Sequence, residues 1–227
     1  MGTPPATIIG MIPARMGSRR LKQKNLRELA GVPLIVRAIR KCKVAGVFDE
    51  IWVNSEDGAF GEIASEEGVA FHRRPAALGD DKATSEEYVA EFLERHPCEF
   101  VVQVHSIAPL LSAEEIKRFV TELRAGQLDC LLSAELVQIE CAYRGRPVNF
   151  RFSEKTNSQD LEPMQRVSWS ITGWRRSTYL AAAAAGRCAT YAGRVGFFPV
   201  NRLAGHVIKT EDDLRMAEAL LPLVPGA

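Results

Sequence analysis

Sequence signatures of several common enzyme classes are absent from this chain, and each absence weakens one class of function. No GxGxxG motif follows the first predicted strand, and no GxxxxGK(S/T) phosphate loop occurs. Gx(S/C)xG nucleophile elbows and HExxH helices are also missing. Dinucleotide binding, P-loop chemistry, nucleophilic hydrolysis and zinc catalysis therefore lack their usual sequence support.

Cysteine is sparse, and long apolar runs are missing. The chain has 5 cysteines, an odd number with no CxxC pair, which argues against a disulfide scaffold or a zinc site and suits a reducing compartment. No apolar run approaches the roughly 20 residues needed to span a bilayer. The N-terminal MGTPPATIIG lacks the cationic start and long apolar region of a signal peptide. These features predict a soluble, cytoplasmic protein with no membrane partner.

Neither sign of charge is in excess. Lys and Arg number 29 against 28 Asp and Glu, which gives a formal net charge of +1. A chain with this balance presents no general polyanion-binding face, so nucleic acid is not an expected partner. Any positive field must be local.

The strongest local field follows the first predicted strand. An apolar run at residues 8–12, closed by Pro13, predicts a buried strand. Gly17 and Ser18 then lie among five cations in ten residues: Arg15, Arg19, Arg20, Lys22 and Lys24. Open α/β sheets bind ligands at the carboxyl ends of their strands, so this loop is predicted to hold the phosphates of a nucleotide. A solvated basic loop is the alternative.

Strand and helix patterns alternate along the first 136 residues. Buried strands are predicted at 50–54, 69–71, 100–104 and 130–136. Predicted helices begin at Pro33, near residue 59, and at the capping boxes Thr84–Glu87 and Ser112–Glu115. Two more helices are expected over 177–185 and after Thr210, whose capping partner is Asp213. The alternation predicts an α/β fold, with one domain over residues 1–227 and a doubly wound, mostly parallel sheet.

The alternation of strand and helix patterns is interrupted within residues 137–175. This stretch contains the polar run SEKTNSQDLEP and then VSWSITGW. We expect extended hairpins and loops that protrude from the domain and serve as a dimer contact or a lid. An element this small cannot bury its own apolar face, so pairing of two subunits in a homodimer is the favoured interpretation.

Four segments together resemble the cytidylyltransferases that make CMP-activated sialic acids and related sugar acids, the CMP-sialic acid synthetase or acylneuraminate cytidylyltransferase family. That family reads A-R-x-x-S-K and then K-N, matched here by Ala14, Arg15, Ser18, Arg19, Lys24 and Asn25. Its R-P-x-x-L-x-x-D-x-A-S-S motif is matched by Arg74, Pro75, Leu78, Asp81 and residues 83–85. A buried strand ending in Gln103 precedes Pro109 and Leu110, and residues 33–53 are also similar. The motifs occur in order and with matching spacing over roughly residues 6–135.

The resemblance implies a nucleotide-diphospho-sugar transferase-like fold and a definite reaction. CMP would pass from CTP to the anomeric hydroxyl of a sialic-acid-like or other 3-deoxy sugar acid, with release of pyrophosphate. The expected partners are thus CTP and a sugar acid.

The resemblance also implies roles for residues of the nucleotide site. Arg15, Arg19 and Lys24 would hold the β- and γ-phosphates, and Arg15 and Lys24 would act in catalysis by neutralising the leaving group. Arg74 and Ser85 would bind the cytosine, whose oxygen and ring nitrogen need donors. The nucleotide-binding set is completed by Ala14, Gly17, Ser18 and Asn25. Arg74 could instead cap a loop, and Arg20 and Lys22 are expected to face solvent.

The acceptor site departs from the family pattern. Relatives read Q-P-T-S-P-L, whereas this chain has QVHSIAPLL, which bears His105 and Ser106. His105 could be a general base for the sugar hydroxyl, a donor to the ligand, or a side chain that bonds the backbone. Gln103 would face the sugar acid, although it could also satisfy a strand end. The remaining expected sugar-binding residues are Gln159, Trp169, Thr172 and Phe197, a set that suggests a sugar other than N-acetylneuraminate.

The expected cofactor is Mg²⁺, but its protein ligands are not identifiable. The family carries an Asp-x-Asp pair before the Thr that opens the last helix, and here those positions hold Val207 and Lys209. The acids that follow, at residues 211–213, favour a helix N-terminus or could bind metal. Three alternatives to the working enzyme remain: a weakened or inactive CTP-binding homologue, transfer to a different sugar acid with altered metal use, and an unrelated dinucleotide-dependent oxidoreductase.

Overall fold

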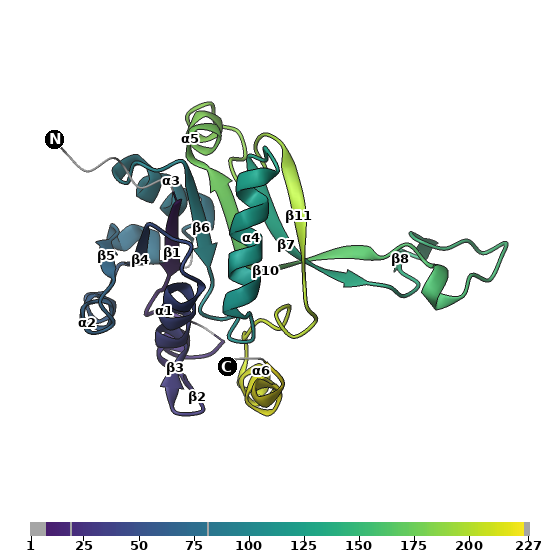
Figure 1. The fold of residues 1–227 in the computed structure, drawn as a ribbon, viewed down its shortest axis with the longest axis horizontal. Coiled ribbons are helices and arrows are strands. Elements are labelled where there is room, and N and C mark those ends of the chain that lie inside the picture. The colour runs from purple at the N-terminus through teal and green to yellow at the C-terminus, as the bar shows by residue number, and fades with distance from the viewer. Residues whose placement is uncertain (1–7, 19, 81, 225–227) are drawn as a thin grey trace.

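A computed structural model describes residues 8–18, 20–80 and 82–224 of the chain (Figure 1). Its centre is a seven-stranded sheet of order β11-β7-β10-β6-β1-β4-β5. The strands are β1 (Ile8–Pro13), β4 (Glu50–Ser55), β5 (Ala70–Arg73), β6 (Phe100–Val104), β7 (Cys130–Val137), β10 (Met164–Arg175) and β11 (Val195–Val200). Every pairing is parallel except those of β10, which runs antiparallel to both β6 and β7.

Helices cover both faces of the sheet because the side chains of its strands alternate. Ile8 and Ile12 of β1 belong to one apolar cluster, whereas Ile9 and Met11 belong to the other. The first cluster includes residues of α1 (Leu34–Ala45), α2 (Ala59–Glu66) and α4 (Ala113–Ala125). The second includes residues of α3 (Ser85–Arg95) and α5 (Arg176–Ala184). The prediction of an α/β, doubly wound, mostly parallel sheet in a single domain is confirmed.

Three predicted helix starts are confirmed in atomic detail. Thr84, Ser112 and Thr210 cap α3, α4 and α6 (Glu211–Leu220), each with a complete capping box. The start of α1 was predicted one residue early, because Pro33 is its N-cap and the helix begins at Leu34.

Short elements complete the chain. They are the 3₁₀ turns η1 (Lys24–Leu26), η2 (Ala76–Gly79), η3 (Ser158–Asp160) and η4 (Leu221–Leu223), and the two-residue strands β2 (Glu28–Leu29), β3 (Val32–Pro33), β8 (Ala142–Tyr143) and β9 (Arg146–Pro147). No helix of the described residues has the length and apolar character needed to cross a bilayer.

A β arm extends from one end of the sheet, to the right in Figure 1. It consists of the end of β7, the β8–β9 hairpin, η3 and the start of β10. The protrusion predicted for residues 137–175 is thus present, but its predicted end is wrong. Residues 171–175 pair with residues 100–104 of β6, so they form part of a central strand and not of an excursion.

The arm joins the sheet at an irregularity in β10. The register of β10 against β7 shifts between Val167 and Thr172, and Trp169 has a φ of 58° there. Buried hydroxyls hold this bulge, because Ser133 Oγ accepts hydrogen bonds from the backbone N–H groups of Ser170 and Ile171, each at 3.2 Å. Bulges re-aim side chains and bend strands, and this one directs Trp169 out of the regular alternation.

Candidate active site

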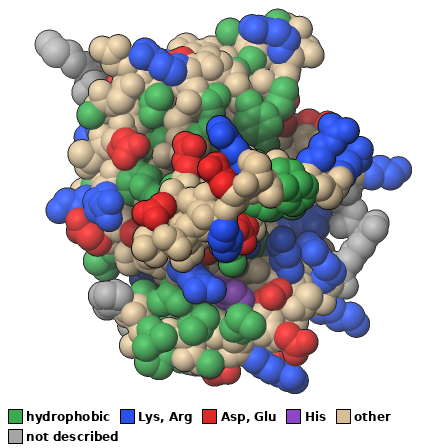
Figure 2. All heavy atoms as spheres, turned by 90° about the vertical axis from the view of Figure 1, so that its right-hand side faces the viewer, with side chains coloured by type: hydrophobic (Ala, Val, Ile, Leu, Met, Phe, Trp, Pro, Cys, Tyr) green, Lys and Arg blue, Asp and Glu red, His purple; other side chains and the backbone are tan. Residues whose placement is uncertain are grey.

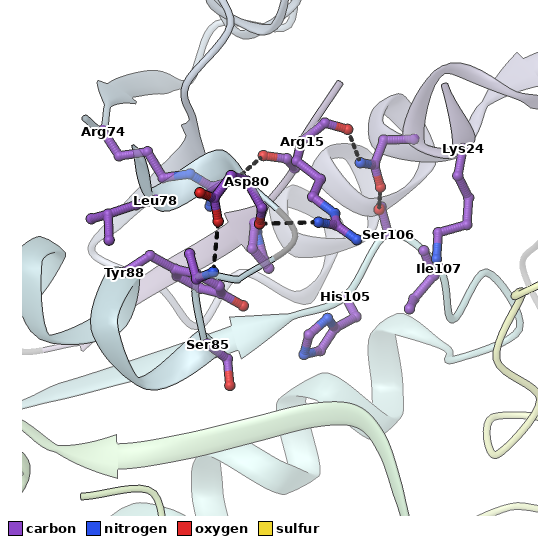
Figure 3. A pocket seen from close by; sticks show the side chains of 14 residues that line it. Arg15, Lys24, Arg74, Leu78, Asp80, Ser85, Tyr88, His105, Ser106 and Ile107 are labelled. Atoms are coloured by element: carbon purple, nitrogen blue, oxygen red, sulfur yellow. Dashed lines mark hydrogen bonds between the residues drawn. The ribbon is translucent and has the colours of Figure 1, made fainter. Parts of the chain in front are cut away.

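A pocket lies at the carboxyl ends of β1 and β6, beside the N-terminus of α3 (Figure 3). Four chain segments line it: residues 13–15, 24–25, 74–88 in part, and 105–107. Among the predicted site residues, the pocket brings together Ala14, Arg15, Lys24, Asn25, Arg74, Ser85, His105 and Ser106. These residues are up to 92 positions apart in sequence, from 14 to 106, and the parallel strands gather them at one edge of the sheet.

Asn25 and Ser106 fix the floor of the pocket through buried hydrogen bonds. Asn25 Nδ2 donates to the carbonyl oxygen of Arg15 at 3.0 Å, and Ser106 Oγ donates to Asn25 Oδ1 at 2.8 Å. The three segments that follow β1, precede β2 and follow β6 are thereby locked together. Both side chains are used in positioning the loop as well as lining the pocket.

Arg74 is the most buried cation of the site, with 3 % of its surface exposed. Its Nη2 donates to Ala14 O at 2.9 Å and to Glu56 Oε2 at 2.8 Å, and its guanidinium lies over the ring of Tyr88. Nε and Nη1 have no partner among the described residues. A buried guanidinium with unused donors is costly unless a ligand accepts from it, so Arg74 presents hydrogen-bond donors to whatever fills the pocket.

Glu56 was not foreseen from the sequence, yet it organises this side of the site. Its Oε1 accepts from the backbone N–H of Met16 at 3.0 Å while Oε2 binds Arg74. The carboxylate therefore joins the cationic loop after β1 to the buried guanidinium. No local pattern marks Glu56, because it acts on residues 18 and 40 positions away.

Lys24 lies at the centre of the positive field. Its pKa is lowered, first because the side chain is buried and then because Arg20, Arg15 and Lys209 are close, while Asp213 opposes the shift. In Figure 3 the side chains of Arg15, Lys24 and His105 extend toward a common space. Mutually repelling cations around one cavity are an anion site, because a bound anion relieves their repulsion.

His105 follows β6 and is held by its backbone, whose N–H donates to Ser170 O at 3.1 Å. The imidazole has no hydrogen-bond partner among the described residues. Burial, and secondarily the charge of Lys24, lowers its pKa to about 4. The ring is therefore neutral near pH 7 and can accept a proton or a hydrogen bond.

The structure places the other predicted residues elsewhere. Gly17 and Ser18 belong to the loop but do not line the pocket, and Arg19 lies outside the described residues. Arg20 and Lys22 are exposed, as predicted. Tyr88 was missed, although it lies three residues after Ser85 and so on the same helix face.

Of the predicted sugar-binding residues, His105 and Ser106 line this pocket and the other five do not. Gln103 and Thr172 are neighbours across β6 and β10 and are fully buried, and Gln103 Nε2 donates to Tyr88 Oη at 2.7 Å. Gln159 is on the arm, exposed. Phe197 is on the edge strand β11, separated from β6 by two strands. Trp169 lies on the bulge, 6.3 Å from Tyr191 between ring centroids.

The described residues at the aligned positions do not fit the Mg²⁺ ion that the sequence resemblance implies. The aligned positions hold Val207 and Lys209, and the described residues contain no cluster of three His, Cys, Asp or Glu side chains suited to a metal. Asp213 Oδ2 instead accepts from the N–H groups of Lys209 and Thr210, both at 2.8 Å, and from the Thr210 hydroxyl at 2.9 Å. Its role is that of a helix cap.

Comparison with known proteins agrees with this geometry. The family described as cytidylyltransferase matches residues 9–172. N-acylneuraminate cytidylyltransferase of Streptococcus agalactiae is 29% identical over 195 residues, which cover 81% of this chain and 47% of that protein. The chain thus spans about half the length of that relative. Pseudaminic acid cytidylyltransferase of Campylobacter jejuni is 31% identical over 164 residues, 66% of this chain and 71% of that protein.

A solved structure supports the fold. A CMP:2-keto-3-deoxy-manno-octonic acid synthetase complexed with CTP superimposes with a TM-score of 0.70 at 15% identity, covering 96% of this chain and 99% of the other. The family match and the similarity to the C. jejuni protein reach well beyond half of the chain. The chain therefore belongs to the cytidylyltransferase family.

Proposed function

We propose that this chain transfers CMP from CTP to the anomeric hydroxyl of a sugar acid of the sialic or pseudaminic type. The observation that carries the proposal is the pocket itself. It combines the cations Arg15 and Lys24 with the buried, incompletely bonded Arg74 at the ligand-binding edge of a parallel sheet. The names of the relatives supply the nucleotide and the class of acceptor.

The triphosphate would lie along the loop that follows β1. Arg15 and Lys24 would contact the β- and γ-phosphates, where negative charge grows as pyrophosphate departs. Arg74 and Ser85 would donate to the cytosine, with the Tyr88 ring packed beneath the guanidinium. Catalysis of this kind consists mainly of positioning and charge neutralisation.

The reaction forms a bond between the anomeric oxygen and the α-phosphorus and breaks the bond between that phosphorus and the β-bridging oxygen. The proton of the sugar hydroxyl needs an acceptor. His105 is the proposed base, because its neutral imidazole lies in the pocket without a protein partner among the described residues. The negative charge of a bound triphosphate would raise the pKa of His105 toward the range in which a base is effective.

The arm is proposed to pair two copies of the chain. It exposes large apolar side chains, among them Ile139, Tyr143, Val148 and Phe152, the last with 78% of its surface accessible. Figure 2, which views the molecule from the arm side, shows apolar and charged side chains next to one another on this face. A two-stranded element cannot cover such residues by itself, and a second arm of the same composition would.

A CTP-binding homologue without turnover is the second candidate. The observation that favours it is the presence of Val207 and Lys209 where the resemblance implies metal-binding carboxylates. Such a protein would retain the pocket and its selectivity for cytosine and would form no CMP-sugar.

Release of pyrophosphate separates the two candidates. The purified chain is incubated with CTP and either N-acetylneuraminate or pseudaminic acid, with ATP as the nucleotide control. Pyrophosphate formation that requires both CTP and a sugar acid supports the enzyme. CTP binding without pyrophosphate from either acid supports the second candidate, and the absence of CTP binding contradicts both.

A further inference from the structure

The segment that carries Lys209 is packed against the pocket. The backbone N–H of Ile208 donates to the carbonyl oxygen of Ile107 at 2.8 Å, and Ile107 lines the pocket next to Ser106. Ile208 is completely buried in an apolar cluster that includes Leu21 of the cationic loop. The position of Lys209 is thus fixed relative to both the loop after β1 and the loop after β6.

Two further contacts hold the backbone of Lys209. Its own N–H donates to the Asp213 carboxylate in the capping box of α6. On the other side, Glu211 forms a two-point ion pair with Arg27, with distances of 3.0 and 2.7 Å. Arg27 directly follows η1, which begins at Lys24. The N-terminus of α6 is therefore joined to the segment that delivers Lys24 to the pocket.

The side chain of Lys209 is exposed. The ammonium is one of the three cations that lower the pKa of Lys24, after Arg20 and Arg15. The charges of the two ammonium groups therefore interact. This field disfavours a further cation and favours a polyanion.

Three acids near this segment and the pocket are already engaged in structure. Asp213 caps α6, Glu211 pairs with Arg27, and Glu56 is bound by Arg74 and Met16. Val207 offers no ligand atom. Divalent hard cations are held by carboxylate and carbonyl oxygens, and the segment that the resemblance assigns to them presents an ammonium instead.

We propose that Lys209 contacts the triphosphate directly and supplies the positive charge that a carboxylate-bound divalent ion would otherwise supply. The chain then binds CTP as the free nucleotide. This inference rests on the proposed function, since it assumes that the pocket holds CTP. The ammonium is a compact charge with three donors, which suits an exposed phosphate oxygen.

Calorimetric titration with CTP in EDTA and again in Mg²⁺ tests the inference. The native chain is expected to bind CTP in EDTA at least as tightly as in Mg²⁺, because the ion reduces the charge that attracts the nucleotide to the lysines. Lys209→Gln is expected to weaken binding in EDTA by about tenfold, since it removes one charge-assisted contact. Lys117→Gln is the matched control, because Lys117 is an exposed lysine on α4 outside the pocket.

The outcomes distinguish this inference from the proposed function. The proposed role of Lys209 is overturned if the native chain binds CTP more weakly in EDTA than in Mg²⁺. It is also overturned if Lys209→Gln binds CTP as tightly as Lys117→Gln. In both cases the assignment of the pocket to CTP still holds. Absence of CTP binding in either buffer overturns the proposed function and the inference with it.

A double variant provides a second test. Val207→Asp combined with Lys209→Asp restores both carboxylates of the family pattern. Its CTP affinity is expected to fall in EDTA and to recover when Mg²⁺ is added. The native chain, by contrast, is expected to bind CTP without Mg²⁺. Unchanged affinity in EDTA would show that residue 209 does not contact the triphosphate.

Discussion

The two ends of the sheet differ in how they assemble a site. At the β1, β4 and β6 end, parallel strands deliver side chains to one pocket, and hydrogen bonds donated by Asn25 and Ser106 and accepted by Glu56 hold the loops in place. At the β7, β10 and β11 end, the candidate ligand contacts are scattered over a bulge, an edge strand and a protruding arm. The residues proposed to bind the nucleotide line one pocket, whereas those proposed to bind the acceptor, His105 and Ser106 apart, lie outside it.

This difference suggests that the two ends of the sheet determine different binding preferences. A preorganised, electropositive pocket is expected to fix the nucleotide, and the arm with the bulge is expected to fix the acceptor. Substitutions at the two ends should therefore affect CTP binding and self-association separately. The largest effect is expected at the buried Arg74.

Arg74→Ala should have the largest effect. It leaves Glu56 buried without its partner and removes the donors aimed into the pocket, so the free energy of unfolding should fall by about 3–5 kcal/mol. CTP binding should be lost in parallel. Thermal unfolding and calorimetry measure both effects, with the exposed neighbour Arg73→Ala as control. An Arg74→Ala protein with native stability would show that the ion pair does not organise the site.

Arg15→Ala and Lys24→Ala come next. Each removes a charge-assisted contact to phosphate, so CTP affinity should fall by more than about tenfold while the fold is retained. Lys22→Ala is the matched control, because Lys22 is an exposed cation of the same loop. The assignment of the phosphate site fails if both variants bind CTP as tightly as the control.

The pH dependence of the free energy of unfolding should report two partly buried imidazoles, those of His105 and His96. Burial lowers the pKa of His105 and of His96 to about 4, with further contributions from Lys24 and His72 respectively. The unfolded chain, with imidazole pKa values near 6.5, binds more protons than the folded chain between pH 6.5 and 4. The free energy of unfolding should therefore decline as the pH falls through this window.

Urea unfolding of the native chain and of His96→Asn at several pH values measures this slope. The variant should show a shallower decline, because one of the two imidazoles is removed. Equal slopes would contradict the assignment of His96.

Phe152→Ser on the arm should have the smallest effect at the pocket. It removes an exposed apolar ring from the proposed dimer contact, so self-association should weaken while CTP affinity stays unchanged. Light scattering and calorimetry measure the two quantities. A native chain that is monomeric at all concentrations would contradict the dimer, and a change in CTP affinity would contradict the separation of the two ends.

Most of the residues predicted to bind the nucleotide lie together in one pocket, and most of those predicted to bind the acceptor do not, for a physical reason. Arg15 and Arg74 follow β1 and β5 closely, while Lys24 begins η1 and Ser85 begins α3, so local patterns indicate their place. Glu56 contacts residues that are distant in sequence, so no local sequence pattern indicates its role.

The central position of β10 was missed for a related reason. Its sequence alternates buried hydroxyls with apolar residues, and the hydroxyls of Ser168 and Ser170 bond to Ser133 across the sheet. Contacts of this kind depend on the assembled sheet, so a reading of local patterns assigned residues 171–175 to an excursion.

Calorimetric titration of the native chain with CTP, and with ATP as control, tests the central claim most directly. We expect saturable binding of CTP and binding of ATP that is weaker by about tenfold or more, because Arg74 and Ser85 are proposed to contact the base. Equal affinity for the two nucleotides, or no binding of either, would contradict the assignment of this pocket to CTP.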